Sequence, residues 1–183
     1  MQFPKDIKQK FDDLSDALLI TNRMKLQLRA NGGNTILLIY PPHEEIYYLE
    51  KVYELYSKES IIDIAQEFTK YIEELSLPGI ELLMKEYGPS KHQIFHSNSD
   101  ANDLFKRIIC TIKSSVDNNK IPILVRTGAL YGTGISNHEI MDDKIVRELN
   151  LPLVIFYPAT ITNEQLMFLN CKSSPGYRAQ VIN

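Results

Sequence analysis

The segment from Arg126 to Gly134 has the residue types that come closest to ligand-binding chemistry in this sequence. It follows an apolar run, contains three glycines and precedes Ser136-Asn137-His138-Glu139, which has the S-x-x-E form of a helix capping box. In an α/β protein such a loop lies at the carboxyl end of a strand, where backbone amides at a helix start can hold an anion. The residues that would hold a cofactor in this loop are Thr127, Gly128, Gly132 and Gly134.

Both phosphate-binding motifs that could fit this loop are incomplete. A P-loop needs G-x-x-x-x-G-K-[ST], but Gly128 and Gly132 are four residues apart and neither is followed by lysine. The dinucleotide fingerprint G-x-G-x-x-G has Asn137 at its third glycine position. We therefore interpret the loop as a structural turn and predict no bound cofactor. A nucleotide- or phosphate-binding enzyme that uses the loop from Thr127 to Gly134 stays open as the alternative.

The spacing of histidine and cysteine predicts no metal site. His92 and His96 are four residues apart, but the glutamate of an H-E-x-x-H zinc motif is absent and Gly88-Pro89 disfavours a stable helix there. Cys110 and Cys171 are far apart and belong to no C-x-x-C pair. We interpret the histidines as loop residues and the cysteines as buried or inert thiols in a reducing compartment.

The acidic residues and nucleophiles form no catalytic set along the sequence. The acidic pairs Glu44-Glu45, Glu73-Glu74 and Asp142-Asp143 are adjacent in sequence, and helix neighbours point about 100° apart, so we interpret them as solvated faces. No G-x-S-x-G nucleophile motif occurs, and neither cysteine has a histidine close to it in sequence. We predict no catalytic residue and no enzymatic activity.

Tyrosine is unusually frequent, with ten residues and no tryptophan. Several of these tyrosines crowd one predicted helix, where the neighbours Tyr47 and Tyr48 cannot both face the core. Tyrosine is common at protein interfaces because it combines a rigid apolar ring with a polar tip. We predict Tyr47, Tyr48 and Tyr131 as partner-binding residues; the alternative is partly buried rings with hydroxyls in water.

The segments that would position these residues alternate between strand and helix. Apolar and β-branched runs predict strands at 35–40, 121–126, 153–157 and 177–182, and a short strand at 61–64 that leads into a helix. Helical spacing predicts helices at 5–18, 44–56, 64–75 and 80–87, with an irregular connection at 88–98. Two more helices are predicted, one capped by Ser99 or Asp100 and one after the capping box, with Met141, Ile145 and Leu149 on its apolar face.

This alternation is typical of an α/β protein with right-handed crossovers. We predict a three-layer, mostly parallel sheet of about four to five strands with helices on both faces, Rossmann-like but without an intact nucleotide motif. The length of 183 residues predicts one domain over 1–183, with the N-terminal helical segment 1–30 packing on it.

Composition excludes several classes of protein from the prediction. The formal net charge of −3 argues against a protein that coats nucleic acid, so no direct nucleic-acid binding is predicted. No apolar run approaches the roughly 20 residues of a membrane helix, and the N-terminus has no signal-peptide pattern. We therefore predict a cytoplasmic protein.

Several strand and turn motifs match a known pattern. They are Ile123-Leu124-Val125-Arg126-Thr127-Gly128-Ala129, Leu151-Pro152-Leu153-Val154-Ile155-Phe156-Tyr157-Pro158, Gln165-Leu166-x-Phe168-Leu169 and Tyr177-Arg178-Ala179, together with Ile36–Pro41 and Ile61–Ile64. In these motifs the chain resembles the BrxB family, small proteins of the BREX bacteriophage-exclusion systems of bacteria and archaea. The resemblance covers about residues 30–183 and is strongest from 121 onward; Ala159 departs from it, because family members often have glycine after the Tyr-Pro.

The resemblance implies a non-enzymatic component of a phage-defence assembly. Its expected partner is the alkaline-phosphatase-like subunit PglZ, with the ATPase and DNA methyltransferase of the system nearby, and it assigns no catalytic residue. Together with the absence of a catalytic pattern, this predicts an assembly or adaptor subunit that acts by protein–protein binding. A homodimer is a further alternative that the sequence leaves open.

Overall fold

A computed structural model describes residues 5–19, 30, 33–97, 102–162, 165–174 and 178–183. The α-helices are α1 (Lys5–Leu18), α3 (Glu45–Leu55), α4 (Ile64–Leu75), α5 (Leu77–Tyr87), α6 (Leu104–Asp117), α7 (Asn137–Asp142) and α8 (Lys144–Arg147). Three short 3-10 helices are η2 (Pro42–Glu44), η3 (Gly88–Ile94) and η4 (Thr127–Leu130). The strands are β1 (Thr35–Tyr40), β2 (Ser60–Asp63), β3 (Pro122–Val125), β4 (Leu153–Thr162), β5 (Gln165–Phe168), β6 (Lys172–Ser173) and β7 (Gln180–Ile182).

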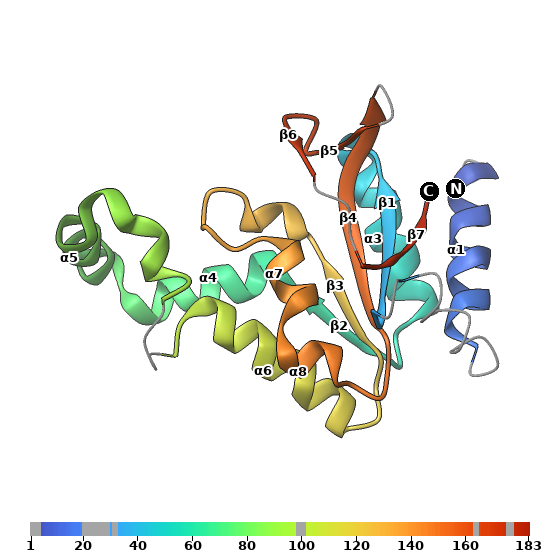
Figure 1. Cartoon of the computed structure of the whole chain (residues 1–183), viewed down its shortest axis with the longest axis horizontal. Coiled ribbons are helices and arrows are strands. Elements are labelled where there is room, and N and C mark those ends of the chain that lie inside the picture. Colours follow the sequence, from blue (N-terminus) through green and yellow to red (C-terminus); the bar gives the residue numbers. More distant parts are fainter. Residues whose placement is uncertain (1–4, 20–29, 31–32, 98–101, 163–164, 175–177) are drawn as a thin grey trace.

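The described strands form one seven-stranded sheet with a parallel body and an antiparallel extension (Figure 1). The parallel strands follow the order β2-β3-β4-β1-β7. Strand β4 continues past this body and pairs with β5, which in turn pairs with β6, both antiparallel. The predicted fold class is confirmed, and the extension adds strands beyond the predicted four to five.

Alternation along β1 divides the core between the two faces of the sheet. Leu37 and Ile39 join a cluster that includes buried residues of α6, α7 and α8, whereas Ile36, Leu38 and Tyr40 join one formed with α1 and α3. A strand whose side chains are buried on both faces must lie between two helical layers. The three-layer arrangement follows.

Helix α1 covers one face of the sheet. Phe11 stacks on Tyr48 and contacts Phe156, at ring-centroid distances of 6.1 Å and 5.8 Å. The buried Lys10 donates a hydrogen bond from Nζ to the carbonyl of Ile39 at 3.0 Å, so its charge is not left without a polar partner. Residues 20–29 of the predicted segment lie outside the described residues.

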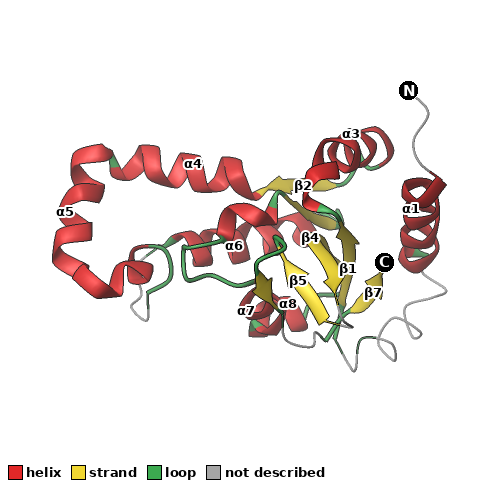
Figure 2. Ribbon diagram, turned by 90° about the horizontal axis from the view of Figure 1, so that it is seen from above, coloured by secondary structure: helices red, strands yellow, loops and turns green. Residues whose placement is uncertain are grey.

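Helices α4 and α5 form an arm that projects beyond the sheet. Figures 1 and 2 show α4 running away from β2, with α5 turned across its far end and η3 and α6 leading back. In the second half of α4, Tyr71 donates from its hydroxyl to the carbonyl of Ile94 at 2.6 Å. Arg107 of α6 pairs with Glu74 at 2.6 Å and lies over the Tyr71 ring at 5.0 Å. These contacts brace α4 against the returning chain.

Most predicted elements are present, and the capping box is confirmed with Ser136 and Glu139 in both of its hydrogen bonds. Three helix predictions are wrong in detail. The helix predicted from Ile80 begins at Leu77, because Ser76 caps it and Pro78 is compatible with a first turn. The helix predicted to start at Ser99 or Asp100 is capped by Asp103; residues 99 and 100 lie outside the described ranges.

The helix after the capping box breaks at Asp143, which separates α7 from α8 and caps the second. The break shifts the buried position from Ile145, which is exposed, to Val146. The predicted connection at 88–98 contains the 3-10 helix η3. Among the described residues, no helix has both the length and the apolar character that crossing a membrane requires.

Candidate functional site

The segments that follow β1 and β3 meet the Pro158 region of β4 at the carboxyl edge of the parallel sheet. The chain leaves β1 toward α3 on one face and leaves β3 toward α7 on the other, and β4 lies between these strands. In open α/β sheets, ligands bind where neighbouring connections diverge in this way. A crevice of about 300 Å³ lies at this position, lined among others by Pro42, Arg126, Gly128, Pro158 and Leu169.

Arg126 lies at the centre of this edge in a left-handed backbone conformation, with φ 54° and ψ 37°. A non-glycine residue in this region is strained, and such strain is common at functional and tightly packed sites. Its Nη1 lies 3.2 Å from Oδ2 of the buried Asp63, an ion-pair contact without the alignment of a hydrogen bond. Oδ1 of Asp63 accepts from the amide of Gln66 and caps α4. The pair thereby connects the ends of β2 and β3.

At the carboxyl end of β1, the Tyr40 side chain is buried and its hydroxyl is hydrogen-bonded. Its hydroxyl donates to Oε1 of Glu45 at 2.7 Å. Burial, and then this bond to a carboxylate, raise the pKa of Tyr40 far above its ordinary value, whereas the nearby charge of Arg126 lowers it. The phenol is therefore a neutral donor and no candidate base.

Side chains of the protein itself pack over Gly128 in this crevice. A Cβ on Gly128 would lie 3.2 Å from Cδ2 of Leu169 and 3.6 Å from Cγ of Pro158. Thr127 is fully buried, and its hydroxyl donates to the carbonyl of Phe156 at 2.8 Å. Two of the four residues that would have held a cofactor thus have structural roles.

The second half of the glycine-rich loop borders a much larger cavity, of about 910 Å³. The cavity lies between residues 130–139 and the β5–β6 hairpin, and Lys172, Ser173 and Ser174 line its hairpin side. Gly134 has φ +85°, and a Cβ there would lie 2.5 Å from Cβ of His92, so only glycine allows η3 to approach. Gly132 has φ +86°, and no described atom lies within 4 Å of its added Cβ.

Two buried polar groups lie in the wall of this cavity. Asn137 is only 4% exposed, and its Oδ1 has no hydrogen-bond partner within the described part of the chain. The hydroxyls of Tyr157 and Ser174 lie 2.6 Å apart. A buried acceptor without a donor costs free energy, so Asn137 is a residue that a ligand could satisfy.

The histidines and cysteines occupy separate positions. His92 is in η3, and His96 stacks on Phe105 with 4.2 Å between ring centroids, so the two share no α-helix face. Within the described ranges, no group of three or more His, Cys, Asp or Glu side chains is placed to hold a metal ion. Of the two alternatives for the cysteines, buried thiols are wrong, because Cys110 and Cys171 are both exposed, and inert thiols stay a prediction.

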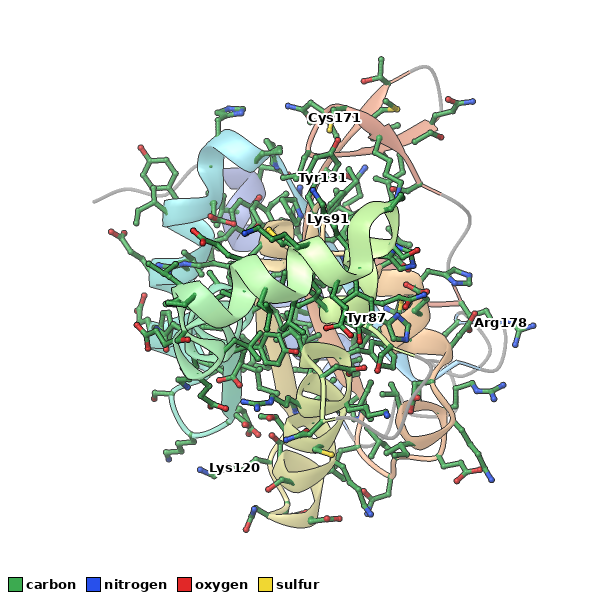
Figure 3. The ribbon with its side chains drawn as sticks, turned by 90° about the vertical axis from the view of Figure 1, so that its left-hand side faces the viewer. Tyr87, Lys91, Lys120, Tyr131, Cys171 and Arg178 are labelled. Carbon is green, nitrogen blue, oxygen red and sulfur yellow. The ribbon has the colours of Figure 1, made fainter. Side chains whose placement is uncertain are left out.

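The predicted partner-binding tyrosines differ sharply in exposure. Tyr48 is 1% exposed and packs between α1 and the sheet, so it is corrected to a core residue. Tyr47 is half-buried. Tyr131 is 58% exposed and lines the cavity. Figure 3, which looks at the arm end-on, shows Tyr131 between Lys91 of η3 and Cys171 of the hairpin.

An exposed apolar surface on α5 was missed by the sequence analysis. Leu77 is 74% exposed, Leu82 is 66% exposed, and Met84 is also exposed, whereas Ile80 faces the arm's interior. We call Leu77, Leu82 and Met84 the arm-tip surface. The signal was present in the sequence, because the apolar residues between 77 and 87 surround the helix and do not form one stripe.

No protein-family model, curated protein or solved structure matches this chain.

Proposed function

We propose that this protein is a non-catalytic assembly component of a BREX-type phage-defence complex and acts by binding a PglZ-type subunit. The motif resemblance given above suggests the system and the partner. The observation that carries the binding role is the arm-tip surface, where Leu77 and Leu82 are exposed on a helix that projects from the sheet. The two leucines lie five positions apart, about 140° around the helix, and large apolar side chains exposed on a projecting element mark a candidate contact for a partner.

The packing over Gly128 supports a non-enzymatic role. In this fold a substrate or cofactor would occupy the carboxyl edge, where Leu169 and Pro158 already contact the position above Gly128. The nucleotide alternative predicts stabilisation of about 2.7 kcal/mol at a hundredfold excess over the dissociation constant. We expect unchanged melting temperatures across a panel of nucleotides and inorganic phosphate, and a shift of that size would favour the enzyme.

Co-expression of the tagged chain with a PglZ-type subunit tests the proposal. We expect the two to co-purify, and Leu77→Gln with Leu82→Gln to reduce the recovered partner about tenfold or more, since interface leucines lose buried area and glutamine preserves helix propensity. Ile161→Thr, which changes an exposed apolar residue on β4, is the matched control and should co-purify like the wild type.

Equal melting temperatures of the variants would show that folding is intact. Recovery of this chain alone, despite soluble expression of both proteins, would contradict the proposed partner. Full recovery of the partner by the arm-tip variant would contradict the role of the arm.

A further inference from the structure

Strand β6 has an open edge at the large cavity. In the described sheet β6 pairs only with β5, and the amide of Ser174 donates to the carbonyl of Leu166 at 2.8 Å. Residues that hydrogen-bond to a given neighbour alternate along an antiparallel strand. The amide and carbonyl of Ser173 therefore point away from β5. Figure 1 shows β6 and the loop before α7 as neighbours on the same side of β4.

The opposite wall of the cavity supplies an acceptor at a fixed position. Asn137 begins α7, and its Oδ1 is buried and without a partner among the described residues. The capping-box bonds of Ser136 and Glu139 hold the start of this helix. Because this oxygen has almost no accessible surface, a backbone amide or another N–H group in the cavity would satisfy it after the Asn137 side chain turns toward the cavity.

The cavity also has an apolar floor and a lysine on the hairpin side of its rim. Leu130, Ile135 and Phe168 line the cavity and are buried, which suits an apolar side chain of the ligand. Lys172 is exposed on the hairpin side, whereas the carboxylate of Glu139 lies on the opposite wall beside Ser136 and His96. The hairpin side of the rim therefore favours an acidic residue beside the apolar one. The volume of about 910 Å³ lies within the range of roughly 300–1,000 Å³ for binding pockets.

We infer that this cavity binds an extended peptide segment of a partner protein, which adds a strand to the open edge of β6 and carries an apolar residue next to an acidic one. Strand addition uses the outward amide and carbonyl of Ser173, while Asn137 accepts a hydrogen bond from the other side of the segment. The inference rests on the proposed function, because it gives the partner a second contact, separate from the arm tip.

The test uses random peptides and needs no identified partner. A phage-displayed library of peptides of about ten residues, an ordinary upper strand length, is selected on the full chain, and enriched peptides are synthesised for binding measurements. We expect peptides with adjacent apolar and acidic residues. We also expect the Ser173 amide to become protected from hydrogen exchange when a peptide is bound, because it would join a ladder.

Three variants locate the binding site. Ser173→Pro removes the outward amide and should weaken peptide binding about tenfold or more, whereas the matched Ser173→Ala retains the amide and should bind within about twofold of wild type. Asn137→Leu should also weaken binding about tenfold, while the melting temperature of the unliganded protein stays equal or rises, because an unsatisfied acceptor is removed. If Asn137 had a purely structural role, its replacement would not combine weaker peptide binding with an equal or higher melting temperature.

Failure to enrich any peptide with a measurable affinity would overturn the inference. Peptides that bind Ser173→Pro and Asn137→Leu as tightly as wild type would overturn it as well, since they must bind elsewhere. Neither result depends on the PglZ-type subunit, whose co-purification is tested separately through the arm tip.

Discussion

The first half of the glycine-rich loop, residues 126–130, is packed against the rest of the protein, whereas the second half, residues 131–139, borders an open cavity. On the first side Gly128 lies against Leu169, and Arg126 is paired with Asp63. On the second side Gly132 faces open space and Asn137 has an unsatisfied oxygen in the cavity wall. The two sides follow one another in sequence but differ in packing.

The comparison shows that glycine content alone does not identify a ligand site. Gly128 makes room for a side chain of the same protein, Gly134 permits the approach of another backbone, and Gly132 satisfies a left-handed turn. Function is therefore expected on the side where space and an unpaired polar atom coincide. The predictions below test the packed and open character of the two sides, from the largest effect to the smallest.

Replacement of Gly134 should have the largest effect on stability. We expect Gly134→Ala to lower the free energy of unfolding by about 3 kcal/mol, because it combines a positive φ with backbone displacement at His92. Gly132→Ala has nearly the same φ in open space and should cost only about 1 kcal/mol. Urea unfolding measures both, and equal losses would show that the approach to His92 is not tight.

Breaking the Asp63–Arg126 pair should have the next largest effect. Arg126→Met leaves a buried carboxylate without its cation and should cost about 2 kcal/mol. Adding Asp63→Asn should recover much of the loss, because asparagine still caps α4 without a charge. A double-mutant cycle in urea gives the coupling energy, and a value near zero would mean that the contact does not hold β2 to β3.

The exclusion of water from the packed side can be tested by how the free energy of unfolding depends on alkaline pH. The folded state keeps the Tyr40 proton to a higher pH than the unfolded chain, whose tyrosine titrates near 10.0, so the associated stability is complete below that pH and is lost above it. We expect the slope of unfolding free energy against pH in this range to be shallower in Tyr40→Phe by about 1.4 kcal/mol per pH unit. Parallel slopes would mean that Tyr40 is accessible to water.

Enlarging Gly128 should have the smallest effect. A Cβ there meets the flexible end of Leu169, so Gly128→Ala should cost less than about 1 kcal/mol. In a Leu169→Ala background the same change should cost nothing, because the contact is absent. Chemical denaturation of the wild type, Gly128→Ala, Leu169→Ala and the double variant provides the check. A loss that persists in this background would place the conflict at the backbone and not at Leu169.

The strands and layers were predictable because their patterns are local. The run from Thr35 to Tyr40 is apolar at nearly every position, as a strand covered on both faces must be. The continuation of β4 past Pro158 was not predictable, because proline usually ends a strand. Here the ladder to β1 ends at Pro158, and β4 then pairs with β5, so the missing amide falls where the strand changes partner.

The candidate site was predictable only in part. Strand ends of a parallel sheet share one edge, so the convergence of Pro42, Arg126 and Pro158 followed from the strand assignment. The closure of that edge depends on Leu169, which comes from a turn of the β5–β6 hairpin. The hairpin is stabilised by pairing with the end of β4 and has no strong turn motif in sequence, so both it and the cavity beside it required the structure.

The bracing of α4 against the returning chain has a consequence for the kinetics of recognition. Tyr71 and Arg107 fix α4 and α5 during folding, so Leu77 and Leu82 are preorganised and little conformational entropy is left to lose when a partner docks. The dissociation rate should therefore respond to residues that never touch the partner. Loosening this brace, for example with Tyr71→Phe, would shorten the lifetime of the proposed complex while the arm-tip surface keeps every contact group.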